Sequence, residues 1–83
     1  MNTKTIITNL EEAREELEKT IAELTSDPEY SQEDLNVALG HAYHHLNIAW
    51  HTRNIDDEKY GKMTDEDFNN WSKFPTDILE YEI

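Results

Sequence analysis

Apolar residues recur every three or four positions in the first third of the chain, as they do on one side of an amphipathic helix. Charged residues fill the other positions, so we expect a helix over about 10–25 that is buried along one side only. Thr8 or Asn9 can cap its start, and Asp27-Pro28 ends it because proline disfavours helical backbone in the preceding residue. The stripe expected to face the core consists of Leu10, Ala13, Leu17, Ile21 and Leu24.

A second, stronger helical pattern follows a short link. Ser31 and Asp34 have the spacing of a capping box, and the periodicity persists to about Ile55, which predicts a helix over 32–55 that is longer than the first. Two helices joined by a short link favour an antiparallel hairpin. The face expected to pack on the first helix consists of Leu35, Ala38, Leu39, Ala42, Leu46, Ala49 and Trp50.

The last third of the chain is more polar. Residues 54–62 are predicted to form a loop, and Thr64 with Asp67 predicts the start of a short third helix over about 65–73. The tail 75–83 fits a final turn or an extended segment. The whole pattern predicts one small all-α domain over 1–83, in which the third helix and the tail pack across the two-helix hairpin.

The back of the second helix is unusual because it is not simply charged. Val37, Ile48 and Ile55 share it with three histidines, whereas an exposed back would normally hold lysine and glutamate. Gly40 lies at its edge, where a mid-helix glycine is easier to understand if another backbone comes near. We therefore expect a covering element, either the 68–81 segment, which we favour, or a second copy of the chain.

Charge narrows the range of partners. The net charge is −12, with −5 in residues 1–30, −1 in residues 31–55 and −6 in residues 56–83. An acidic surface repels phosphate, so direct contact with nucleic acid or an anionic membrane is not expected, whereas a basic protein partner is. The chain has no cysteine, no membrane-spanning run and no signal-peptide core, so we expect a cytoplasmic protein.

The histidines raise the question of a metal site. His41, His44 and His45 have the spacing at which neighbouring helical turns present two imidazoles to one ion, but the sequence shows no third ligand and no HExxH motif. The acidic run 56–67 has a glycine at the sixth position of a calcium loop, although Glu58 and Tyr60 replace the expected ligands. Neither pattern predicts a cofactor, and no nucleophile stands beside an evident base.

The favoured function is therefore a small non-enzymatic protein-interaction module of the adaptor or inhibitor type, acting alone or as a homodimer. An acidic mimic of DNA is the second candidate, and a histidine-based metal-binding or sensing protein is the third. The interaction surface is expected on the second helix, at His41, His44, Ile48, His51, Tyr43, Asn47, Trp50 and Arg53.

Overall fold

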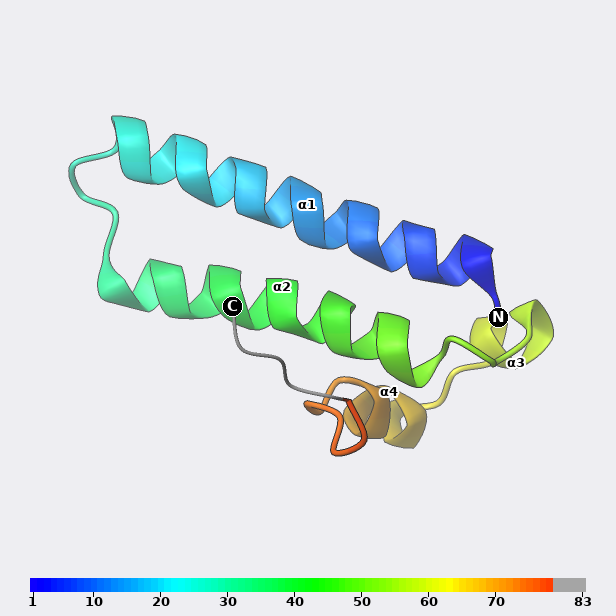
Figure 1. Ribbon diagram of the computed structural model, residues 1–83. Helices are drawn as coiled ribbons and strands as arrows, with labels where there is room; N and C mark the ends of the chain where they lie inside the picture. The colour runs from blue at the N-terminus through cyan, green and yellow to red at the C-terminus, as the bar shows by residue number, and fades with distance from the viewer. Residues whose placement is uncertain (79–83) are drawn as a thin grey trace.

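The computed structural model describes residues 1–78, and its longest elements are two helices that lie side by side in opposite directions (Figure 1). These are α1, Thr3–Ser26, and α2, Gln32–His51. Two short helices follow, α3 over Asp57–Gly61 and α4 over Asp65–Trp71. The all-α hairpin predicted from the periodicity is confirmed. None of the helices in the described part of the chain combines the length and apolar character that a membrane crossing needs.

The start of α1 lies seven residues earlier than predicted. Thr3, Ile6 and Ile7 are weak helix formers, which explains why the sequence pattern missed these first two turns. Tertiary contacts hold it instead. The side-chain oxygen of Asn2 accepts a hydrogen bond from the Thr5 amide, and its Nδ2 donates to the carbonyl of Ile55 (2.8 Å).

The end of α2 lies four residues earlier than predicted, so α2 is the shorter of the two long helices, with 20 residues against 24. No proline stops it. Its C-cap is the fully buried Thr52, whose amide and hydroxyl both donate to the carbonyl of Ile48 (2.9 and 2.6 Å). The backbone after this cap is held by a distant residue, because the amide of Asn2 donates to the carbonyl of Arg53. The guanidinium of Arg53 then donates to the carbonyl of Trp50 (2.7 Å), which satisfies a second carbonyl of the last turn.

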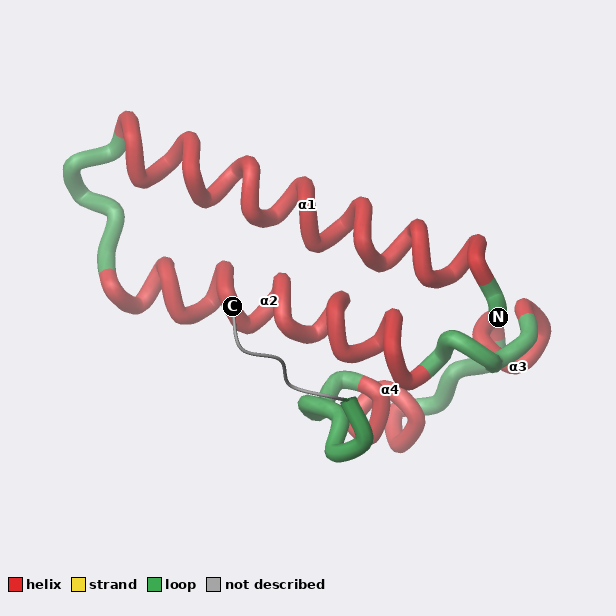
Figure 2. The backbone as a smooth tube through the Cα atoms, in the orientation of Figure 1, coloured by secondary structure: helices red, strands yellow, loops and turns green. Residues whose placement is uncertain are grey.

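The predicted loop over 54–62 contains α3. Asp56 caps it by accepting a hydrogen bond from the amide of Lys59 (2.7 Å), and the helix lies beside the start of α1 (Figure 2). Its Tyr60 hydroxyl accepts a hydrogen bond from the side chain of Asn9 (3.1 Å), which joins α3 to α1. Five residues carry too little periodicity to be recognised in a sequence.

The C-terminal half of the back of α2 is covered within the chain, as favoured from the sequence, whereas Val37 near its start is 58% exposed. The α4 helix lies across α2 on the side away from α1 (Figure 1). Phe68 meets the ring of His44 edge to face, and the side chain of Asn47 donates to the carbonyl of Ser72 (2.8 Å). The capping boxes predicted at Ser31 and Thr64 are both confirmed. Leu79 and Tyr81, which we also expected in this cover, lie outside the described residues.

The predicted core face of the hairpin is partly wrong. Ala13 of α1 and Ala38, Ala42 and Ala49 of α2 are buried, but the larger members of the same stripes are not. Leu46 is 42% exposed, whereas Ile48, which was assigned to the opposite face, is only 4% exposed. Helices α1 and α2 approach through their smallest side chains, so the leucines beside this seam stay at the surface.

Gly40 is also explained differently from what the sequence suggested. It has an ordinary helical conformation, and a methyl group added at its Cα would meet nothing within 4 Å. No backbone in the described part of the chain comes near it.

The burial pattern predicts that Ile48→Asp unfolds the protein in dilute solution, whereas Leu46→Asp leaves the helical content intact. Burying an unpaired carboxylate in place of Ile48 costs about 4 kcal/mol or more, whereas the Leu46 position is open to water in a single copy of the chain. Circular dichroism during thermal unfolding measures both effects. The opposite ranking would show that the leucine side is the main core.

Replacement of Gly40 by alanine is expected to raise the free energy of unfolding by about 0.5–1 kcal/mol, because the added methyl group finds open space and the unfolded chain loses conformational freedom. Urea denaturation measures the change. Gly61→Ala, at the end of the short α3, is the matched control and should have a smaller effect. A loss of stability at position 40 would reveal a neighbour there.

The stability of α4 is expected to fall in acid. The amide of Thr64 donates a hydrogen bond to the Asp67 carboxylate (3.2 Å), and with the ammonium of Lys59 it lowers the pKa of that carboxyl. This contribution is therefore present above the ordinary carboxyl pKa and is lost as the pH falls through the lowered value. NMR chemical shifts of α4 should show this loss in the native chain and in Asp65→Asn, but not in Asp67→Asn, where α4 is weakened at every pH.

Candidate protein-interaction surface

The hairpin has one apolar side and one polar side. On the polar side, Glu12 lies 3.0 Å from Nδ1 of His45, and Glu16 lies 3.9 Å from Nδ1 of His41. These contacts cross from α1 to α2. They place both histidines against carboxylates of the neighbouring helix rather than against each other.

The apolar side consists of two rows of aliphatic residues that border the seam. The leucines of each row are seven residues apart, which is two helical turns, and Ile21 lies between two of them at a spacing of four and three, so each row runs along its helix. Their side chains are between 38% and 64% exposed, although leucine and isoleucine are usually buried. The members on α1 are Leu10, Leu17, Ile21 and Leu24, and those on α2 are Leu39 and Leu46.

Both rows lie on the same side of the hairpin. Leu10 of α1 and Leu46 of α2 line the same cavity, and the other members continue from these two at helical spacing. The cavity has a volume of about 500 Å³ and an almost wholly apolar lining. The rest of its lining is Met1, Ile6, Tyr43, Asn47, Ala49, Trp50, Arg53, Phe74, Pro75 and Ile78.

A small ionic cluster closes the end of this cavity. The Arg53 guanidinium stacks on the ring of Trp50, 3.9 Å from its centroid, and lies 3.6 Å from the Asp77 carboxylate. The indole Nε1 donates to the same carboxylate (2.9 Å). This hydrogen bond, and to a smaller extent the charge of Arg53, lowers the pKa of Asp77 below its ordinary value. The cluster ties the segment after α4 to the end of α2.

The eight residues predicted as an interaction surface do not form one surface. Ile48 and Asn47 are buried, and His51 contacts the carbonyl of Lys73 through Nε2 (2.9 Å) beneath the segment after α4. His44 packs against Phe68, whereas His41 points toward Glu16 on the other side of α2. The members that the fold brings together on the apolar side are Tyr43, Trp50 and Arg53, with the edge of Asn47.

The three candidate metal ligands are also separated. His41 and His45 lie on the polar side of the hairpin, each beside a different glutamate, and the ring of His44 packs against Phe68 of α4. Among residues 1–78, no three His, Asp or Glu side chains gather closely enough to hold a metal ion. The acidic run 56–67 contains the helix α3 and therefore does not have the conformation of a calcium loop.

The leucine rows were recognised in the sequence but were assigned to the wrong environment. A signal for the correct assignment was present, because a second stripe of α1 holds the small residues Thr5, Asn9, Ala13 and Thr20, which are all buried. These oppose the alanines of α2. Small residues on both helices indicate a close approach along that line, with the leucines to one side of it.

Comparison with protein families, characterised proteins and solved structures found nothing that matches this chain. Functional inference therefore rests on the surface described above.

Proposed function

We propose that this chain is a small non-enzymatic protein-interaction module, and that it binds its partner through the apolar side of the hairpin. The observation that supports this most is the exposure of the two leucine rows. Single exposed leucines are common on proteins, but six aliphatic side chains in two aligned rows, continuous with an apolar cavity, are typical of a protein interface.

The geometry favours a helical partner. Rows spaced by seven residues leave a shallow groove between two nearly antiparallel helices, and an amphipathic helix or helical hairpin fills such a groove with its own apolar residues. The aromatic residues at one end, Tyr43 and Trp50, are of the kind that often contributes most to binding. The border on α2 holds Gln32 and Asn36, which suits the polar rim of an interface.

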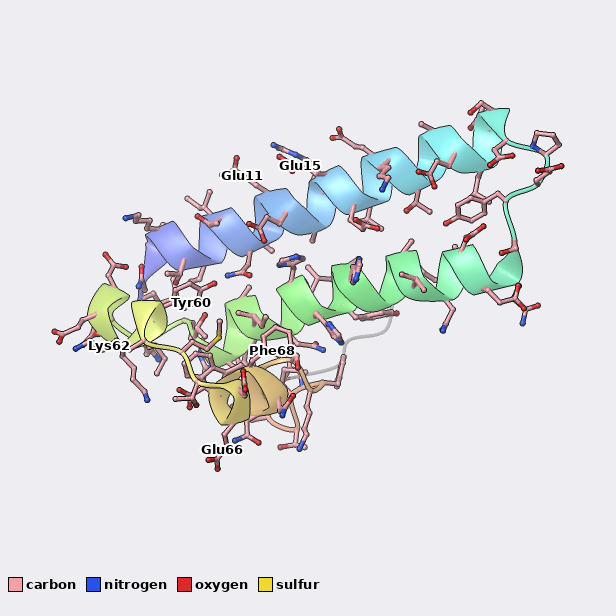
Figure 3. The ribbon with its side chains drawn as sticks, turned by 180° about the vertical axis from the view of Figure 1, so that it is seen from behind. Glu11, Glu15, Tyr60, Lys62, Glu66 and Phe68 are labelled. Atoms are coloured by element: carbon pink, nitrogen blue, oxygen red, sulfur yellow. The ribbon has the colours of Figure 1, made fainter. Side chains whose placement is uncertain are left out.

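A basic partner, expected from the net charge, would use a different part of the surface. Glu11 and Glu15 point away from α2 on the outer edge of α1 (Figure 3). Ion pairs there would add to binding on the apolar side and would weaken with salt. The chain is proposed to act in the cytoplasm, where such an adaptor or inhibitor would meet its partner.

An acidic mimic of DNA draws less support. Such a mimic needs an uninterrupted row of free carboxylates, whereas Arg14 lies within 4 Å of Glu11 and Glu18, and Lys19 lies 3.9 Å from Glu23. These ion pairs place positive charge along the acidic edge of α1. The apolar side would also have no role in such a protein.

The proposal predicts that Ile21→Glu abolishes partner capture and that Ala22→Glu does not. The two positions are adjacent on α1 and both are exposed, so the two variants add the same charge at nearly the same place on the same helix. They differ in that only Ile21 lies on the apolar side. Affinity capture with chemical cross-linking, scored for all proteins including untagged copies of the chain, measures the difference. Equal capture by both variants would contradict the proposal.

A further inference from the structure

We infer that the occupant of the apolar side is a second copy of this chain, so that two hairpins pack face to face as a four-helix bundle. The inference rests on the proposed function, because it names the partner for the same surface. Four properties of the described residues lead to it: a thin core, the exposed area, the spacing of the rows and the placement of charge.

The core of one copy is thin. Among residues 1–78 the buried apolar side chains are four alanines, Ile48 and Pro75, and the other buried residues are polar, such as Asn9 and Thr52. An alanine contributes a single methyl group to a core, at about 0.8 kcal/mol per buried carbon, whereas a leucine contributes four carbons. The aliphatic residues that normally stabilise a helical domain are thus left outside the hairpin, where a second layer would bury them.

The exposed area fits the interface of a dimer. Nine half-exposed apolar side chains and the more exposed Met1 lie on this side, and at about half of the area such side chains lose on burial they present on the order of 600 Å². This exposed apolar area is at the upper limit for the largest apolar patch of a monomeric protein. It approaches the roughly 800 Å² that each partner contributes to a specific interface. The apolar side therefore has about the size that a stable dimer needs.

The spacing of the rows is self-complementary. Leu10, Leu17 and Leu24 on α1 and Leu39 and Leu46 on α2 repeat every seven residues, the spacing that allows helices to pack with side chains interlocked along their length. In a two-fold symmetric interface the same surface is used twice, so each row must fit a row of identical spacing. Two copies of this hairpin satisfy that condition.

Charge restricts where two copies can meet. With a net charge of −12 per chain, most contacts between copies would bring carboxylates together. The two rows contain no charged residue, and the charges at their borders are largely paired. On α2, Arg53 lies 3.6 Å from Asp77, and Glu33 is the one carboxylate beside Gln32 and Asn36. At the α1 border Arg14 lies between Glu11 and Glu18. Glu11 and Glu15 point outward (Figure 3), so they would remain in water in the bundle. The apolar side is a surface that a copy can approach without burying like charges.

Sedimentation equilibrium from about 1 μM to about 1 mM tests the inference. The native chain and Ala22→Glu are expected to reach twice the monomer mass of 9.8 kDa, and added salt should strengthen the dimer because it screens the repulsion between acidic copies. Ile21→Glu, which would bury two unpaired carboxylates in each dimer, should raise the dissociation constant at least about 100-fold. Equal dimerisation of Ile21→Glu and Ala22→Glu would overturn the inference, since the contact would then lie elsewhere.

Thermal unfolding covers the case in which Ile21→Glu does not fold alone. The midpoint of the native chain should rise with protein concentration if a dimer is the folded form, and a constant midpoint together with a monomer mass would overturn the inference. The native chain could instead be monomeric and still capture other proteins that Ile21→Glu no longer captures. That result would overturn the dimer but support the proposed function, with a different protein as the partner. A monomeric chain with equal capture by both variants would remove both proposals.

Discussion

The close approach of α1 and α2 through small side chains is the constraint on which the rest of the structure depends. Ala13 of α1 and Ala42 of α2 are buried at this seam, and the separation of two packed helices is set by the size of the residues between them. Because alanine and threonine occupy the seam, the leucines of both helices are displaced to one side. The apolar side of the hairpin is thus a direct consequence of a narrow seam.

The seam is also polar at its open end, which determines how the N-terminal turn and α3 are placed. The side chain of Asn9 is almost fully buried. Its Nδ2 donates to the Thr5 carbonyl and to the Tyr60 hydroxyl, and its Oδ1 lies 3.2 Å from Nδ1 of His45. Each buried polar atom needs a partner, so this one side chain joins α1, α2 and α3 in a single arrangement. The polar contacts provide the specificity that the alanines cannot.

Several features of the fold were predictable because their causes are local. The capping boxes at Ser31 and Thr64 and the stop at Asp27-Pro28 each depend on residues within four positions of one another, and all three were found where the sequence placed them. The start of α1 and the end of α2 were misplaced because their causes are distant. Asn2 bonds to the chain near Ile55, and no periodicity reports a contact over 53 residues.

The candidate surface shows the same division. The sequence identified the aliphatic stripes of both helices, since periodicity reveals which residues share a face. It did not reveal that the helices would meet beside those stripes rather than on them, because the rotation of each helix about its axis depends on which pair of faces packs more closely. The histidines were separated for the same reason, as His44 turned toward α4 and His45 toward α1.

The sequence by itself determined that this protein is helical and acidic, where two of the four helices within residues 1–78 begin, and which residues form apolar rows. Only the tertiary structure decided which rows are covered. It buried Ile48 and left Leu46 at the surface, although both lie on apolar stripes of the same helix. Burial is a property of the pair of surfaces that meet, and a pattern along one chain describes only one surface at a time.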